Sequence, residues 1–387
     1  MMFNLSAKHL MLAALFTQLL LSSNAVSFPG TVGPYNTSMA TTQLIDHHRL
    51  NPYATRPQPR TLMISLFHPV PPAACCPSLT PYMDPITAAF EDEEYAQAGT
   101  SAGAFGSLTL QTCKPCTNST SSRRVKGPKY PLVLFSPGLG NTRLLYSAMA
   151  QQLSSTGYIV VTVDHPYDAG IVTFPDNTTI LAANITTDTQ IVDDLNIRVR
   201  DLSFVLDQLH RPSVISKLII GQICGLDTSK VGIYGHSLGG ATAAEAMLSD
   251  SRLKGGINLD GTFFGSVINR GLDKPFMIMA HEGKNLTTDV TWGALWPKLR
   301  GIRRRFMLSG STHGTFTDLA QAADIIGLRE EFPTQAAALL GSIEGVRALQ
   351  VIATYTSRFF DFVLKGKKVE LLDMSSMEFP EVTAGEN

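Results

Sequence analysis

Short apolar runs recur along the chain from Tyr130 onward, and they alternate with stretches of helical periodicity. The runs are continuous and occupy 132–135, 158–163, 231–234, 256–259, 276–280 and 306–308. Runs of this length are typical of strands buried on both faces of a parallel sheet, because helices cover each side. The pattern predicts an α/β fold, with a mostly parallel central sheet flanked by helices, within residues 129–366.

Two longer stretches carry a single apolar stripe, at steps of three and four residues. One stripe consists of Val192, Leu195, Val199, Leu202, Leu206 and Leu209, and the other of Leu349, Ile352, Phe359 and Val363. Such a stripe is the packing face of a helix. We therefore predict two long helices, which end at Arg211-Pro212 and near Gly366.

The ends of the chain lack this pattern. Residues 26–128 are rich in Pro, Gly, Ser and Thr and contain one strand-like run at 60–67, so we expect an irregular N-terminal extension with early strands. Residues 367–387 form a tail. Residues 1–25 combine Lys8, an apolar stretch at 10–21 and small residues at 23–25, which predicts a cleaved secretory signal rather than a membrane anchor. No later segment looks able to span a bilayer, so we expect a secreted chain without a transmembrane segment.

The charge balance narrows the possible partners. The 387 residues are 44% hydrophobic, with 31 Lys and Arg against 32 Asp and Glu, and no basic run is longer than 303–305. Nucleic acid binding requires a basic footprint, so we exclude nucleic acid as the main partner. The sequence leaves the oligomeric state open.

The predicted export makes disulfides and N-glycosylation possible. The pairs Cys75-Cys76 and Cys113-x-x-Cys116 predict two disulfides between the clusters, with the connectivity open and Cys224 left over. A zinc or redox site is disfavoured, because these cysteines lie in a loop and no histidine pair accompanies them. The motif for N-glycosylation occurs at Asn36, Asn118, Asn177, Asn184 and Asn285, and the stretch 173–189 looks like a surface loop.

The clearest chemical signal follows the apolar run at 231–234. Gly235-His236-Ser237-Leu238-Gly239 is followed by an alanine-rich segment, which is the strand, tight turn and helix of a nucleophile elbow. The turn would present the Ser237 hydroxyl above the sheet, and the Leu238 N–H at the start of the helix would face a developing oxyanion.

A nucleophilic serine needs a base and an acid that orients it. Asp260 ends the next apolar run, and His313 lies in a small-residue loop after the last one. Glu282 is the rival acid, and His165 and His281 are weaker candidates for the base. The order Ser237, Asp260, His313 is that of the α/β-hydrolase fold.

Two further features belong to the expected substrate site. The loop 136–141 contains two glycines, and its Leu139 N–H is the candidate second oxyanion donor. Four aromatics either line an apolar acyl pocket or a lipid-facing rim, or belong to the core, and the sequence leaves these alternatives open: Phe263, Phe264, Trp292 and Trp296.

At these residues the sequence resembles the secreted, calcium-independent platelet-activating factor acetylhydrolases and their fungal and bacterial relatives. The matching stretches are 135–140, 145–147, 163–165, 235–242, 256–260 and 310–313, with weaker matches at 33–35 and 60–63. The resemblance implies Ser237 as nucleophile, Asp260 rather than Glu282 as acid, His313 as base, and Leu139 and Leu238 as oxyanion donors. The sequence departs from the animal members at Pro137, at Leu238 and in the insertion that carries Cys75 to Cys116.

The sequence therefore predicts a secreted serine hydrolase that cleaves carboxylic esters through an acyl-enzyme, without a metal or cofactor. We expect a small ester or lipid substrate and peripheral contact with lipid. Only the resemblance implies that the substrate is a phospholipid with a short sn-2 acyl group. A general carboxylesterase, a polyester hydrolase or a tailoring hydrolase are alternatives. A non-catalytic binding protein of the same fold is a remote one.

Overall fold

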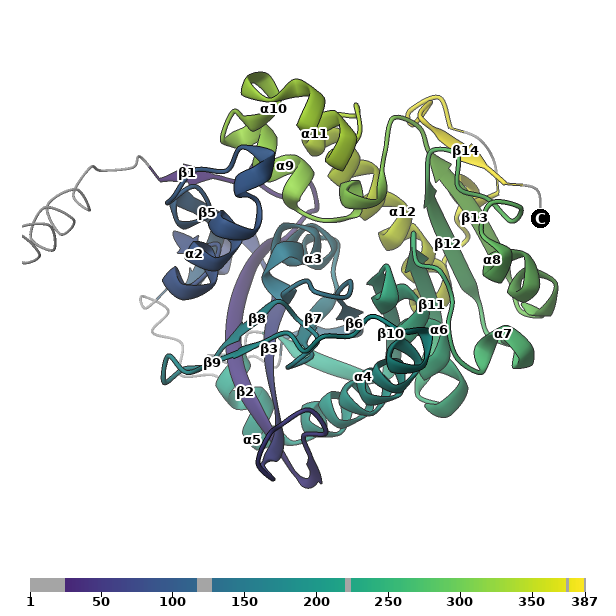
Figure 1. Ribbon diagram of the computed structural model, residues 1–387, viewed down its shortest axis with the longest axis horizontal. Coiled ribbons are helices and arrows are strands. Elements are labelled where there is room, and N and C mark those ends of the chain that lie inside the picture. Colours follow the sequence, from purple (N-terminus) through teal and green to yellow (C-terminus); the bar gives the residue numbers. More distant parts are fainter. Residues whose placement is uncertain (1–24, 117–126, 220–223, 374–375, 386–387) are drawn as a thin grey trace, which may run out of the picture.

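The computed structural model describes residues 25–116, 127–219, 224–373 and 376–385. Within them the central sheet has the strand order β14-β13-β12-β11-β10-β6-β7-β3-β2 (Figure 1). The strands of this sheet are β2 (Asn36–Leu50), β3 (Pro59–Val70), β6 (Lys129–Ser136), β7 (Ile159–Asp164), β10 (Gly225–His236), β11 (Leu253–Leu259), β12 (Phe276–His281), β13 (Arg303–Leu308) and β14 (Val382–Ala384).

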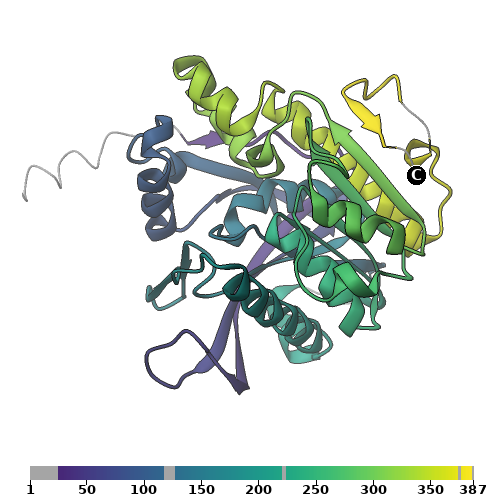
Figure 2. The ribbon, with the colours of Figure 1, turned by 45° about the vertical axis from the view of Figure 1, so that its right-hand side comes forward.

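The inner strands of the sheet, from β7 to β13, pair in parallel, and both edges are antiparallel. Figure 2 shows the β2–β3 hairpin at one edge and β14 at the other. The predicted mostly parallel sheet with flanking helices is confirmed. The sequence indicated β3 but not β2, because this edge strand is largely exposed and its buried positions, such as Thr37, Leu44 and Asp46, are few and partly polar.

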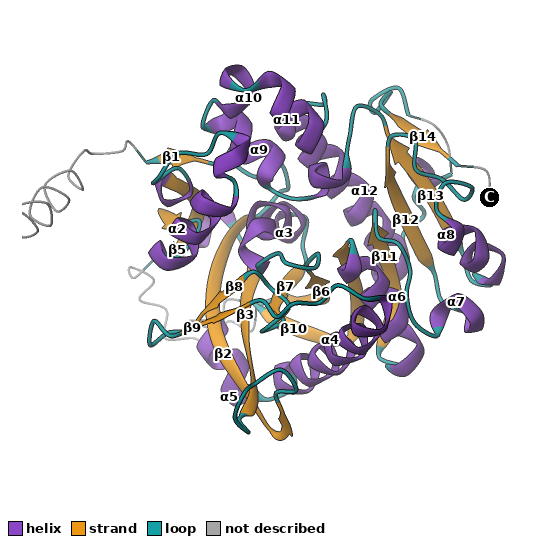
Figure 3. Cartoon of the chain, in the orientation of Figure 1, coloured by secondary structure: helices purple, strands orange, loops and turns teal. Residues whose placement is uncertain are grey.

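Helices cover both faces of the sheet, as Figure 3 shows. Alternate residues of β6 separate the two cores: Val133 and Phe135 pack with α3 and α12, whereas Leu132 and Leu134 pack with α4 and α6. The helices are α2 (Pro85–Glu94), α3 (Ser147–Ser155), α4 (Asp188–Leu209), α5 (Pro212–Leu218), α6 (Leu238–Ser249), α7 (Val267–Arg270), α8 (Val290–Leu295), α9 (Leu319–Ile325), α10 (Leu328–Glu331), α11 (Pro333–Leu340) and α12 (Gly345–Lys365).

One helical stretch departs from the expectation about membrane spans. Residues 333–365 are long and apolar enough to cross a bilayer, although half of the tested window is buried inside the protein. The stretch comprises α11 and α12, and the α12 side chains Val351, Ile352 and Phe359 lie fully buried in the core. The apolar composition of α12 is thus accounted for by packing against the sheet.

A small second sheet lies in the N-terminal region. It has the order β1-β5-β4, formed by β1 (Val26–Ser27), β5 (Leu108–Pro115) and β4 (Cys75–Pro81). Disulfides join Cys75 to Cys113 and Cys76 to Cys116, so the prediction of two bridges between the clusters is confirmed, and the structure supplies the connectivity. Cys224 is free and buried.

The candidate glycosylation sites differ in accessibility. Asn36, Asn177 and Asn184 are exposed, and Asn285 is half-buried. Asn118 and nearly all of the predicted signal, residues 1–24, lie outside the described residues. The stretch 173–189 is mostly exposed. It contains β9 (Thr179–Leu181), which pairs with β8 (Ile171–Thr173) just before it in a short hairpin.

Candidate active site

Ser237 occupies the turn between β10 and α6. Its backbone has φ 55° and ψ −125°, and its N–H donates to the Leu259 carbonyl at 2.9 Å. A non-glycine residue in this region of φ costs about 1–3 kcal/mol, which the surrounding structure must offset. The turn fits only because its neighbours lack side chains: a Cβ on Gly235 would lie 2.3 Å from the Gly239 backbone, and one on Gly239 would lie 1.9 Å from the Ser136 carbonyl oxygen.

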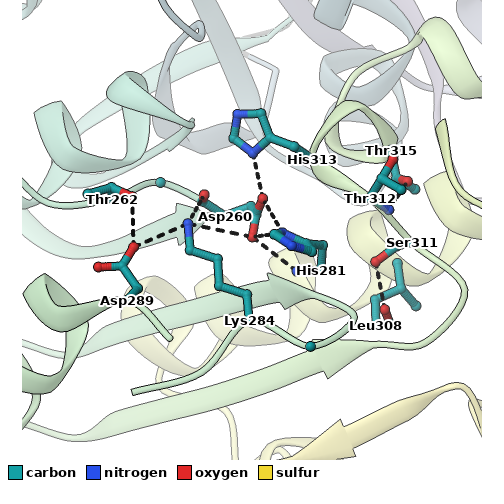
Figure 4. Close-up of polar contacts among 12 residues, drawn as sticks. Asp260, Thr262, His281, Lys284, Asp289, Leu308, Ser311, Thr312, His313 and Thr315 are labelled. Carbon is teal, nitrogen blue, oxygen red and sulfur yellow. Dashed lines mark hydrogen bonds and ion pairs between the residues drawn. The ribbon is translucent and has the colours of Figure 1, made fainter. Parts of the chain in front are cut away.

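Asp260 follows β11 and lies fully buried beneath the site. Its carboxylate accepts hydrogen bonds from Nδ1 of His313 at 2.5 Å and from Nδ1 of His281 at 2.7 Å, and the Lys284 ammonium lies 3.9 Å away (Figure 4). Burial alone would raise the pKa of Asp260, but the two imidazole hydrogen bonds and the Lys284 charge outweigh it and hold the pKa well below its usual range. The group is therefore a carboxylate at neutral pH.

His313 lies at the start of a short 3-10 helix, His313–Phe316, that follows β13. Its side chain is 51% exposed and lines the same pocket as Ser237. Because Nδ1 donates to Asp260, the other ring nitrogen, Nε2, is available as an acceptor. No hydrogen bond joins Ser237 to His313 within the described residues, and contacts of this kind often tighten only when substrate binds.

His281 and Glu282, which follow each other at the end of β12, have separate contacts. The His281 ring bonds both oxygens of Asp260, and its backbone N–H donates to the same carboxylate at 3.0 Å. The Glu282 carboxylate accepts from the Gly310 N–H at 3.0 Å instead. In the described structure Asp260, and not Glu282, therefore contacts His313. His165, the remaining candidate base, is buried against Asp201 and Ser136.

The pocket that contains Ser237 and His313 has a volume of about 360 Å³. Its wall includes Leu139, Leu319 and Leu339, together with Tyr95 from the segment after α2, so the N-terminal region contributes to the site. None of the four proposed pocket aromatics lines it. Phe263, Trp292 and Trp296 are core residues on the α6 side of the sheet, and Phe264 packs against that core.

The loop 136–141 leaves one backbone amide free. The N–H groups of Gly138, Gly140 and Asn141 donate to Tyr146 Oη, to the Asp168 carbonyl and to the Gly138 carbonyl, at 3.1, 3.1 and 3.2 Å. The Leu139 N–H has no acceptor in the described part of the chain. The Leu238 N–H is the first of α6, where the helix dipole is positive. These two amides are the predicted oxyanion donors, and no hydrogen bond to another group is found for either within the described residues.

Asp260, His281 and His313 also have the spacing of a metal site, since their ligand atoms lie within 4.8 Å of one another. A metal there would need a bare lone pair on each imidazole nitrogen that faces the carboxylate. Both nitrogens lie within hydrogen-bond distance of that carboxylate, which can accept two N–H bonds without a metal.

Comparison with known proteins places the chain in a family. A family model described as platelet-activating factor acetylhydrolase, isoform II, matches residues 87–195 and 216–366. The chain belongs to this family. A relative from Arthroderma benhamiae, named "Probable 1-alkyl-2-acetylglycerophosphocholine esterase", is 31% identical over 96% of this chain and 97% of its own length.

Other relatives of this acetylhydrolase-family chain differ in coverage. The platelet-activating factor acetylhydrolase of Cavia porcellus is 30% identical over 58% of this chain and 56% of its own length. A solved ferulic acid esterase from Streptomyces cinnamoneus has a TM-score of 0.76 and 28% identity, and covers 94% of this chain and all of its own. The resemblance seen in the sequence is therefore confirmed, and the chain is a carboxylic ester hydrolase of the α/β type.

Proposed function

We propose that the protein is a secreted serine hydrolase that cleaves a short acyl group from a glycerophospholipid through an acyl-enzyme. The observation that carries the proposal is the arrangement at one sheet edge, where buried Asp260 accepts from Nδ1 of His313 and His313 shares a pocket with Ser237. A serine is activated toward a carboxylic ester by a histidine base that a buried carboxylate orients, so this arrangement supports the proposal.

In the proposed cycle, Nε2 of His313 takes the proton of Ser237 while the Ser237 oxygen forms a bond to the ester carbonyl carbon. The Leu139 and Leu238 N–H groups stabilise the oxyanion, and its collapse breaks the ester bond, with His313 returning the proton to the departing alcohol. His313 then takes a proton from water, whose oxygen bonds to the acyl carbon. Collapse of this second oxyanion breaks the bond between the acyl carbon and the Ser237 oxygen, His313 returns the proton to that oxygen, and the acid leaves.

The pocket supports a short acyl group. On one side its wall is formed by Tyr95, Leu319 and Leu339. Behind this wall lies a second, apolar cavity of only about 30 Å³, which shares these three residues. A space of that size holds about two water molecules. A long acyl chain that ran in this direction would have to displace the wall, whereas an acetyl group would not.

The test compares three classes of ester at equal concentration: 2-acetyl phospholipid, the long-chain phospholipid with the same headgroup, and p-nitrophenyl acetate. We expect cleavage of the acetyl phospholipid and of p-nitrophenyl acetate, with little activity on the long chain. If neither phospholipid is cleaved while p-nitrophenyl acetate still is, the phospholipid proposal is contradicted.

A second candidate function is a carboxylesterase acting on a soluble aromatic ester. The solved structure that covers 94% of this chain is a ferulic acid esterase, which is the observation in its favour. A feruloyl ester added to the same comparison separates the two candidates. Preferential cleavage of the feruloyl ester over the acetyl phospholipid would favour the carboxylesterase.

Leu339→Ala is expected to shift the preference toward longer acyl groups. The substitution removes three carbon atoms from the wall between the two cavities. We expect kcat/KM for hexanoyl relative to acetyl p-nitrophenyl esters to rise by at least about tenfold, because room for even one methylene is worth about that much. Val346→Ala is the control, because Val346 is also exposed but lines neither cavity. An unchanged ratio in Leu339→Ala would show that the wall does not limit acyl length.

Secretion is the remaining part of the proposal. The signal-like residues 1–25 and the two disulfides support it, because structural disulfides persist in oxidising compartments. Occupied glycosylation sites are then expected at the exposed Asn36, Asn177 or Asn184.

A further inference from the structure

The Tyr146 hydroxyl lies where three segments of the candidate site meet. Tyr146 is fully buried and ends the short helix Arg143–Tyr146 that follows the loop 136–141. Its oxygen accepts the Gly138 N–H at 3.1 Å and the Asn141 side-chain amide at 2.7 Å, both from that loop. Its third contact is Nδ1 of His236, at 2.9 Å.

The hydrogen bonds of Tyr146 and His236 form one network, and the donor and acceptor of each bond can be assigned from the groups that it joins. Nε2 of His236 lies 3.1 Å from the His313 carbonyl oxygen, which can only accept, so Nε2 carries the hydrogen. Burial, helped by the nearby His313, lowers the pKa of His236 to about 3, so the ring is neutral and its Nδ1 is an acceptor. The Tyr146 O–H therefore donates to His236 while its oxygen accepts two bonds.

Each end of this hydrogen-bond network lies next to a group of the proposed reaction. Gly138 precedes Leu139, His236 precedes Ser237, and the bonded carbonyl belongs to His313 itself. The packing is equally close: the rings of His236 and His313 have centroids 4.5 Å apart, and a Cβ on Gly138 would lie 3.3 Å from the Tyr146 oxygen. Hydrogen bonds and direct packing thus connect the Leu139 end of the network to the His313 end.

We propose that the Tyr146 hydroxyl is a positioning group: it holds the Leu139 oxyanion amide and the His313 base in the relative position that the reaction requires. The inference rests on the proposed function, since it takes the roles of Leu139 and His313 from there. Tyr146 itself lies behind the pocket and does not line it.

The chain offers a matched control for this hydroxyl. Tyr146 and Tyr234 are both buried, and each ring lies 4.6 Å from the Phe135 ring, centroid to centroid. The Tyr234 hydroxyl, however, has no hydrogen-bond partner in the described structure. Tyr146→Phe and Tyr234→Phe therefore remove the same atom from the same core, but only Tyr146→Phe breaks the network.

With p-nitrophenyl acetate, we expect Tyr146→Phe to lower kcat by about 10- to 100-fold with KM within about twofold of wild type. This range lies at or below the loss caused by removing one oxyanion donor outright. Affinity for a trifluoromethyl ketone, which forms an oxyanion on the serine, should fall by the same factor as kcat. Tyr234→Phe should leave all three quantities within about twofold.

His236→Phe removes the next two hydrogen bonds of the network, from Tyr146 and to the His313 carbonyl. It replaces Tyr146→Phe as the test variant if Tyr146→Phe does not fold. If the two residues act as one unit, the double variant should lose no more than the worse single variant. Two outcomes would overturn the role of Tyr146, provided that wild type reacts with a fluorophosphonate. One is an equal kcat in Tyr146→Phe and Tyr234→Phe, and the other is additive losses in the double variant. Failure of wild type to react would overturn the proposed function as well.

Discussion

Ser237→Ala is expected to abolish labelling by a fluorophosphonate probe and to lower kcat by about six orders of magnitude. The probe phosphonylates a serine only when a neighbouring base takes its proton, and nucleophile removal in a serine hydrolase has an effect of this size. The structure provides the local reason, because the turn between β10 and α6 directs Ser237 into the pocket shared with His313. In-gel fluorescence and initial rates on p-nitrophenyl acetate measure the two effects.

Ser249→Ala is the matched control for this experiment. Ser249 is the last residue of α6, and its hydroxyl donates to the Ala246 carbonyl, away from the pocket. The control should be labelled like wild type. Equal labelling of Ser237→Ala and Ser249→Ala would remove Ser237 from the role of nucleophile.

Asp260→Asn is expected to lower kcat by about four orders of magnitude while the fold is retained. The substitution keeps the shape but removes the charge that stabilises protonated His313, and an amide at this position favours the wrong imidazole tautomer. His281 keeps a polar neighbour, because the amide oxygen of Asn can still accept one N–H bond. Circular dichroism and thermal unfolding check the fold, and kcat is read on p-nitrophenyl acetate.

Glu282→Gln tests the rival acid in the same assay. Because the Glu282 carboxylate accepts from the Gly310 N–H and has no contact with His313 in the described structure, kcat should stay within a fewfold of wild type. The assignment is reversed if Asp260→Asn loses less than tenfold and Glu282→Gln loses more.

The part of the site that could be predicted from sequence is the part determined by local sterics. The turn at Ser237 needs glycines on both sides, a preceding apolar strand and a following helix, and all three signals lie within a few residues of one another. The strand ends that carry Asp260 and His313 were equally readable, because the carboxyl ends of parallel strands share one edge of a sheet.

The choice between Asp260 and Glu282 depended on backbone geometry that a sequence does not display. Asp260 has a positive φ of 59°, which lets a residue just past its strand point back toward His313. Residues from neighbouring strand ends look alike in sequence. The resemblance to a family, and not the spacing, therefore gave Asp260 priority.

Contacts between distant segments were the least predictable. Nothing in the sequence around His281 distinguishes an imidazole that bonds Asp260 from one that faces solvent. The Tyr146 network likewise joins positions 90 residues apart. Large aromatics such as Trp292 are read equally well as pocket or core, because apolar burial serves both, and only the packing decides.

The segment that carries Tyr95 is closed by two disulfides. Tyr95 belongs to an excursion between β4 and β5 whose two ends are tied together by Cys75–Cys113 and Cys76–Cys116. The Tyr95 side of the pocket is therefore part of a covalently closed ring. Loss of the two bridges is therefore expected to loosen the Tyr95 side of the pocket, which the β4–β5 pairing alone would then hold, while the turn at Ser237 lies outside this ring.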